Sequence, residues 1–225
     1  MKYKAILFDV DDTLLDSMAA RVATLERVFK SAGIAHDDPE QFLRDLHGNS
    51  LEAVLTQLAR DRGIDADLFD EYRRIYWNRE SSMLTLYPGV KDALEKLSGL
   101  GLKLGIVTTK YADVEFEGKT VGAAGELEEL GIADFFSIVV GFEHVSLPKP
   151  HPHGINLALN HLRTMPVETL MVGDSAADIQ AAKAAGCWGC HATWGLPPKE
   201  RTNLLGSTIP DFILDSPGEL LKLVK

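Results

Sequence analysis

Short runs of apolar residues alternate along the chain with stretches in which apolar residues recur every three or four positions. The apolar runs occupy residues 5–8, 102–108, 137–140, 169–172 and 189–193. Continuous apolar runs of this length are typical of strands buried on both faces. Helical patterns precede the last four runs, at residues 90–100, 126–130, 152–162 and 178–185. The alternation predicts an α/β fold, a parallel sheet covered by helices on both faces.

One long segment, residues 17–83, breaks this alternation. It has helical periodicity and no convincing strand, and the Pro88–Gly89 turn follows its far end. The chain has 225 residues, a length between one domain and two. We therefore expect a core domain formed by residues 1–16 and 84–225, with a helical domain of residues 17–83 inserted into it.

Charge and composition narrow the possible partners and the compartment. The formal net charge of −10 argues against a nucleic-acid binder and against an anionic membrane surface. Residues 5–8 are too short for a signal peptide, and no run of about eighteen apolar residues occurs. The two cysteines, Cys187 and Cys190, are too few for a disulfide framework. We expect a cytoplasmic protein.

Acidic residues follow two of the expected strands. Asp9 and Asp11 come directly after the first strand, and Asp174 follows the strand at 169–172, with Asp178 four residues further on. Parallel strands end at the edge where open α/β sheets bind ligands, and clustered carboxylates favour magnesium. A solvated acidic turn explains Asp9 and Asp11 equally well on spacing alone, and helix capping is the alternative for Asp178.

Residues suited to binding phosphate occur at two further places. Thr108 and Thr109 end the strand at 102–108, and Lys149 lies between Pro148 and Pro150. The prolines restrict the backbone on both sides of the lysine. For Lys149 taken alone, a surface turn is the alternative interpretation.

Together these motifs resemble those of the haloacid dehalogenase (HAD) superfamily, in particular its phosphoglycolate-phosphatase-like branch with a helical (C1-type) cap. The first motif is Asp-x-Asp-x-Thr, and a strand-ending threonine, a lysine and an acidic pair follow in the family's order. The matching residues are Asp9, Asp11, Thr13, Thr108, Lys149, Asp174 and Asp178. The resemblance implies a Rossmann-like parallel sheet core with an inserted all-helical cap.

The resemblance also implies an activity: magnesium-dependent phosphatase chemistry on a small phosphorylated metabolite, either phosphoglycolate-like or a sugar phosphate monoester. Asp9 is then the nucleophile that forms an aspartyl-phosphate, and Asp11 is the acid and base. Thr108 and Lys149 bind the transferring phosphoryl group, while Thr109 and His47 are candidate substrate contacts.

By the same resemblance, Mg²⁺ is the expected cofactor. Its ligands are Asp9, the backbone carbonyl of Asp11, and Asp174, with Asp178 ligating directly or orienting through water. In the family a glycine usually stands where this chain has Asp12.

Two other functions share parts of this pattern. A β-phosphoglucomutase-like sugar phosphomutase has every core motif and differs in what the cap delivers to the site. A receiver-like phospho-accepting signalling module also combines Asp, Thr and Lys, but its phosphorylated Asp follows the third strand and it has no cap.

We expect a small phosphorylated metabolite as partner, no nucleic acid or membrane, and a monomer or homodimer.

Overall fold

The chain divides into two compact units. The computed structural model describes residues 2–35, 38–46, 50–197 and 206–224. Unit 1 consists of Met1–Asp16 and Thr85–Lys225, and unit 2 consists of Ser17–Leu84. Unit 2 is therefore a single continuous segment inserted into the sequence of unit 1.

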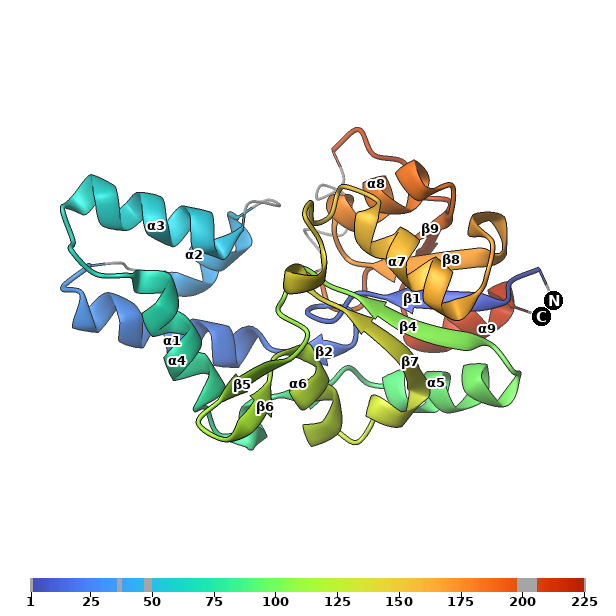
Figure 1. The fold of residues 1–225 in the computed structure, drawn as a ribbon, viewed down its shortest axis with the longest axis horizontal. Helices are drawn as coiled ribbons and strands as arrows, with labels where there is room; N and C mark the ends of the chain where they lie inside the picture. Colours follow the sequence, from blue (N-terminus) through green and yellow to red (C-terminus); the bar gives the residue numbers. More distant parts are fainter. Residues whose placement is uncertain (1, 36–37, 47–49, 198–205, 225) are drawn as a thin grey trace. The chain divides into compact units, whose positions relative to one another are not determined.

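A six-stranded sheet forms the centre of unit 1, with the order β10-β9-β8-β1-β4-β7 (Figure 1). Every pair of neighbours in it is parallel. Its strands are β1 (Ala5–Phe8), β4 (Lys103–Val107), β7 (Phe136–Val140), β8 (Thr169–Gly173), β9 (Trp188–Ala192) and β10 (Phe212–Leu214). This arrangement confirms the α/β fold with a parallel sheet that the sequence pattern predicts.

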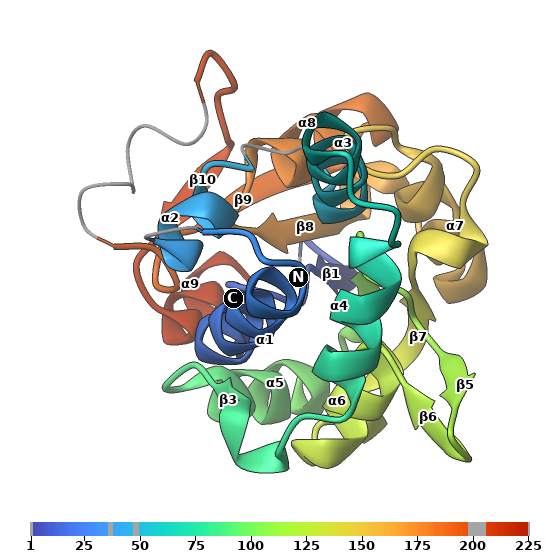
Figure 2. The same cartoon turned by 90° about the vertical axis from the view of Figure 1, so that its left-hand side faces the viewer.

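The sheet has a hydrophobic layer on each face. Along β1, Ile6 and Phe8 belong to one cluster and Ala5 and Leu7 to the other, because successive side chains of a strand point to opposite faces. Figures 1 and 2 show the helices on both sides of the sheet. The first cluster includes residues of α5 (Val90–Gly99), α6 (Ala123–Glu129) and α9 (Leu220–Leu223), and the second includes residues of α7 (His153–Leu162) and α8 (Ala176–Ala185).

The chain leaves and re-enters unit 1 through a short antiparallel ladder. There, β2 (Leu15–Asp16) pairs with β3 (Thr85–Leu86). The two crossing segments thus satisfy part of each other's backbone hydrogen bonding, and the insertion leaves the main sheet undisturbed.

A hairpin that the sequence pattern does not predict follows β4. Its strands are β5 (Val114–Phe116) and β6 (Lys119–Val121), and it projects beyond β7 (Figure 2). Glu117 and Gly118 form the turn with φ of 50° and 77°, the two positive values that a type I′ turn requires. Three-residue strands carry too little alternation to be recognised as strands, and for the same reason β10 is also absent from the prediction.

Unit 2 is built from helices: α1 (Met18–Ser31), α2 (Pro39–Arg44), α3 (Leu51–Arg62) and α4 (Leu68–Trp77). Helix α1 packs against α2 and α4, and α3 packs against α4. The Ser50 side chain caps α3 by accepting from Ala53 N, and Gly63 ends that helix at a φ of 64°. Single-turn 3₁₀ helices occur at Ser81–Met83, Ala133–Phe135, Phe142–His144, Pro166–Glu168 and Pro217–Glu219.

Membrane crossing needs a long apolar helix. Within the part of the chain that the structure describes, every helix is too short or too polar for that.

The hairpin turn yields a stability prediction. Glu117→Asn places a residue that tolerates positive φ at the first turn position, so we expect the free energy of unfolding to rise by about 0.5–1 kcal/mol. Gly118→Ala, at a φ of 77°, is the matched control and is expected to lower it. Urea denaturation followed by circular dichroism measures both changes, and a lower midpoint for Glu117→Asn contradicts the expectation.

Candidate active site

The candidate site lies at the carboxyl ends of β1 and β8, at the centre of the sheet. From β1 the chain continues to β4 and β7 on one side, and then crosses to β8, β9 and β10 on the other. The strand order therefore reverses between β1 and β8. Open α/β sheets bind ligands at such a switch point, outside the carboxyl ends of the strands.

Three carboxylates meet at this edge. Asp9, Asp174 and Asp178 each offer an oxygen within 4.8 Å of the others. Burial raises the pKa of Asp9 to about 6, an effect that the nearby Lys149 ammonium partly offsets. Burial also raises the pKa of Asp174, and the negative charges of neighbouring carboxylates add to the shift. The cluster therefore holds negative charge at a free-energy cost.

Lys149 occupies the space between two of these carboxylates. Its Nζ lies 2.9 Å from Asp9 Oδ1 and 2.5 Å from Asp178 Oδ1, and it donates to the Val107 carbonyl at 2.9 Å. Only 3% of the side chain is exposed. Burial opposes the charged form of this lysine, but Asp178 and Asp9 overcome that effect and raise its pKa above the ordinary value. Lys149 is thus a buried member of the site, and the surface-turn alternative is wrong.

Asp178 performs two tasks. Its Oδ2 accepts from the Ser175 amide at 3.0 Å and from Ser175 Oγ at 2.6 Å, which completes a capping box at the start of α8. Its Oδ1 pairs with Lys149. The structure thus shows the helix cap directly, and it also places Asp178 beside Lys149.

A glycine makes room for the Asp178 side chain. A Cβ on Gly173 would lie 2.2 Å from Asp178 Cγ, a distance that no side chain can adopt. Gly173 is the last residue of β8. A glycine that ends a strand directly before an acidic residue is the sequence signal for this close approach.

The loop after β1 is fixed by contacts with distant segments. Thr13 Oγ1 donates to Asp174 Oδ1 at 3.3 Å, and Trp194 Nε1 donates to the Thr13 carbonyl at 2.8 Å. Asp12 has a φ of 57°, in the left-handed region that glycine adopts most readily. A Cβ on Gly195 would lie 2.1 Å from the Asp12 carbonyl oxygen, so the two loops approach closely.

Asp11 lies apart from the carboxylate cluster that the described residues form. Its Oδ1 is 3.2 Å from Nζ of Lys110, and the same Nζ is 2.5 Å from Glu126 Oε2. Neither Lys110 nor Glu126 is identified from the sequence. Lys110 stands two residues after Thr108, but nothing in the sequence pattern relates it to Glu126.

The remaining predicted residues differ in their surroundings. Thr108 is buried and its Oγ1 accepts from Lys110 N at 3.2 Å, whereas Thr109 is exposed. Thr108 follows Val107, whose carbonyl accepts from Lys149. His47 lies outside the described residues.

Both cysteines are free and buried. Burial raises the pKa of Cys187 and of Cys190 to about 12, so neither thiol is activated as a thiolate at neutral pH. Their environment is that of core residues.

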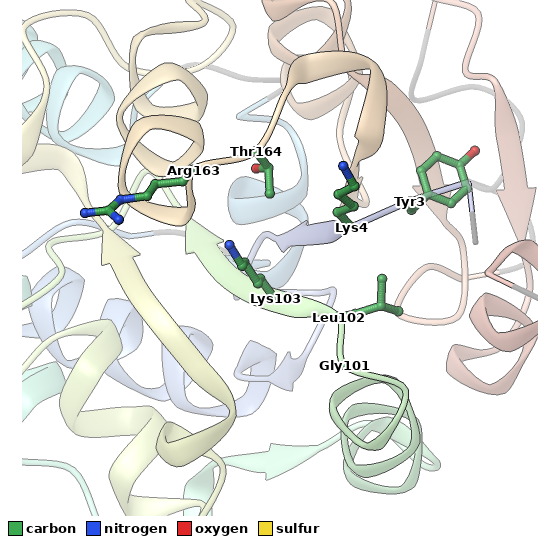
Figure 3. A pocket seen from close by; sticks show the side chains of 7 residues that line it. All are labelled: Tyr3, Lys4, Gly101, Leu102, Lys103, Arg163 and Thr164. Carbon is green, nitrogen blue, oxygen red and sulfur yellow. The ribbon is translucent and has the colours of Figure 1, made fainter.

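A pocket of about 340 Å³ opens at the opposite, amino-terminal edge of the sheet. Figure 3 labels the residues that line it, from Tyr3 and Lys4 before β1 to Arg163 and Thr164 after α7. Lys4 pairs with Glu168 at 2.6 Å, and Lys103 donates to the Leu162 carbonyl at 2.6 Å. Both lysines thus have partners within unit 1, and none of the predicted site residues lines the pocket.

The carboxylate cluster fits a divalent cation. When ionised, three carboxylates and the Lys149 ammonium sum to two negative charges at one buried edge. Carboxylate oxygens are the donors that Mg²⁺ prefers. The raised pKa values of Asp9 and Asp174 report the electrostatic cost that a cation would offset.

Known proteins resemble this chain along nearly its whole length. A family model described as haloacid dehalogenase-like hydrolase matches residues 6–191. Pyrophosphatase PpaX of Bacillus pumilus is 32% identical over 221 residues, which cover 97% of this chain and 95% of that protein. Phosphoglycolate phosphatase of Vibrio vulnificus is 32% identical over 230 residues, which cover 98% and 96%. The crystal structure of a predicted phosphoglycolate phosphatase from Haemophilus somnus matches with a TM-score of 0.82 and 25% identity, covering 100% of this chain and 99% of that chain.

The close contact at Gly173 leads to a prediction. Gly173→Ala forces the Asp178 side chain away from Lys149 and Ser175, so we expect the free energy of unfolding to fall by roughly 2–4 kcal/mol. Gly99→Ala is the matched control, because a Cβ there meets no atom within 4 Å. Urea denaturation measures the free energy of unfolding of both variants. Equal midpoints would show that the Asp178 contacts contribute little to stability.

Proposed function

This chain belongs to the haloacid dehalogenase-like hydrolase family, and from that premise we propose that it is a magnesium-dependent phosphatase acting through an aspartyl-phosphate intermediate. Its proposed substrate is a small phosphorylated metabolite. Family membership favours hydrolase chemistry over the receiver-like alternative, in which the phosphate is a signal.

One observation carries the proposal: the Asp9 carboxylate, 13% exposed, lies at the strand edge, paired with Lys149 and clustered with the carboxylates of Asp174 and Asp178. The ion pair with Lys149 restricts rotation of Asp9, and a nucleophile held in one orientation reacts at a lower entropic cost. The Lys149 ammonium has three N–H groups, and three acceptors are within reach of them. This geometry supports a role for Lys149 in holding the Asp9 side chain in place.

In the proposed first step, a carboxylate oxygen of Asp9 attacks phosphorus and the bond to the leaving oxygen breaks. Asp11 donates its proton to that oxygen, which departs as an alcohol. Thr108 and Lys149 bind the phosphoryl oxygens, and Thr109 and His47 are proposed substrate contacts.

In the proposed second step, a water molecule attacks the phosphorus of the aspartyl-phosphate and gives a proton to Asp11. The acyl phosphate bond breaks, inorganic phosphate leaves, and Asp9 and Asp11 return to their starting states.

Asp9, Asp174 and the backbone carbonyl of Asp11 are the residues that would hold Mg²⁺. Both oxygens of Asp178 are engaged by Lys149 and Ser175, which favours a positioning role for this residue. When bound, the ion supplies positive charge that reduces the repulsion between the Asp9 carboxylate and an anionic phosphate.

The relatives suggest two substrate classes. Phosphoglycolate phosphatase and pyrophosphatase PpaX act, by their names, on a phosphate ester and on a phosphoanhydride. We propose the ester class for this chain, as a phosphoglycolate-like or sugar phosphate, with pyrophosphate as the second candidate.

We further propose that unit 2, Ser17–Leu84, acts as a cap that excludes water during transfer. The two free, buried cysteines support a reducing compartment such as the cytoplasm.

The nucleophile proposal predicts the effect of Asp9→Asn. The amide keeps the size of the carboxylate but cannot form the acyl phosphate, so we expect phosphate release to fall by about a thousandfold or more. Release is measured with phosphoglycolate, glucose 1-phosphate, pyrophosphate and p-nitrophenyl phosphate, with and without Mg²⁺.

Asp134→Asn, an exposed acid, is the control and should keep wild-type rates. Full turnover by Asp9→Asn would refute the covalent mechanism. Conversion of glucose 1-phosphate into glucose 6-phosphate without phosphate release would instead establish the phosphomutase alternative.

The metal proposal predicts how Asp174→Asn changes the melting temperature, first without Mg²⁺ and then with it. Because burial and neighbouring charge raise the pKa of Asp174, we expect the metal-free variant to melt at or above the wild-type temperature. We also expect Mg²⁺ to raise the melting temperature of the wild type and of Asp134→Asn, but to have little effect on Asp174→Asn. An equal Mg²⁺ response in all three proteins would place the ion elsewhere.

A further inference from the structure

Lys110 lies beside the proposed acid and base, and the mechanism above gives it no task. Its Nζ is 3.2 Å from Asp11 Oδ1 and 2.5 Å from Glu126 Oε2. The three side chains are 18%, 20% and 2% exposed, in the order Lys110, Asp11 and Glu126. One largely buried ammonium thus joins the loop after β1 to the first turn of α6.

The backbone around Lys110 is held from both sides. Its amide donates to Thr108 Oγ1 at 3.2 Å, and its carbonyl accepts from Phe142 N at 2.7 Å. Shortly after it, Ala112 N donates to Glu143 Oε1 at 2.8 Å. The ammonium therefore extends from a fixed segment of chain.

Glu126 is fixed as well. At the start of α6, Ala123 N donates to the Tyr111 carbonyl at 2.9 Å. A Cβ on Gly122 would lie 2.7 Å from that carbonyl oxygen, so the two segments are closely packed. The chain between these contacts forms the β5–β6 hairpin, which returns the backbone to the point where Glu126 meets Lys110.

We infer that Lys110 is a positioning residue for proton transfer: anchored by Glu126, its ammonium holds the carboxyl group of Asp11 in one orientation. The ammonium contacts two carboxylates, those of Asp11 and Glu126, and of these Asp11 is the one with a proposed chemical role. Its effect is therefore on Asp11. Proton transfer depends on the acid lying within hydrogen-bond reach of the leaving oxygen. This inference rests on the role proposed for Asp11 in the phosphatase reaction.

The test compares two leaving groups. An alkoxide needs a proton from Asp11 to depart, whereas p-nitrophenolate departs without one. The ratio kcat/KM reports the first chemical step, in which that proton is given. We expect kcat/KM of the double variant Lys110→Met, Glu126→Gln to fall about tenfold or more further with phosphoglycolate than with p-nitrophenyl phosphate.

Both residues are replaced together because Lys110→Met alone would leave the buried Glu126 without its cation. Should the double variant fail to fold, Lys110→Gln gives the same comparison, since its amide can still donate to Glu126. The matched control is Lys119→Met, Glu128→Gln, which removes two exposed charges of the same kinds. It should leave kcat/KM unchanged with both phosphoglycolate and p-nitrophenyl phosphate.

An equal fall with both esters, or no fall, overturns the positioning role of Lys110. If the wild type releases phosphate from none of phosphoglycolate, glucose 1-phosphate, pyrophosphate and p-nitrophenyl phosphate, with or without Mg²⁺, the proposed function itself fails. The two failures are therefore distinguishable.

Discussion

The buried ion pairs of Lys149 are the interaction on which the candidate site depends. Its ammonium contacts Asp9 after β1, Asp178 in α8 and the carbonyl of Val107 at the end of β4. A buried ammonium without partners is strongly unfavourable, and so are the buried carboxylates without the ammonium. These groups stabilise the folded state only together. Lys149 therefore fixes the relative positions of three elements at the edge where the chemistry is proposed.

The strand order and close backbone packing at a few positions allow these charged side chains to gather at one edge of the sheet. The strand order reverses between β1 and β8, which brings the residues after both strands to one edge. Gly173 leaves space for the Asp178 side chain, and Gly195 lets its loop approach the Asp12 carbonyl. Ser175 and Thr13 then orient Asp178 and Asp174 through hydrogen bonds. The proposed cation and phosphate sites therefore depend on this local arrangement, because the chain as a whole has a net charge of −10.

Two segments added to the sheet domain leave it intact because each begins and ends at a backbone contact. Unit 2 departs and returns through the β2–β3 ladder. The β5–β6 hairpin departs and returns where Ala123 N donates to the Tyr111 carbonyl. In each case the flanking segments satisfy their own polar groups. The hairpin also has a consequence for the site, because α6 follows it and carries Glu126 to Lys110.

The sequence by itself determined the central strands, the helices between them, the inserted helical segment and the acidic residues at the strand ends. These features are local: a periodicity of two or 3.6 residues and the residue that follows a strand can be read within a short window. The tertiary structure alone decided the strand order, the burial of Lys149 and the partners of Asp11. Lys110 is separated by 99 residues from Asp11 and by 16 from Glu126, and no periodicity relates them. Electrostatic interactions depend on distance in space, which only the folded chain sets.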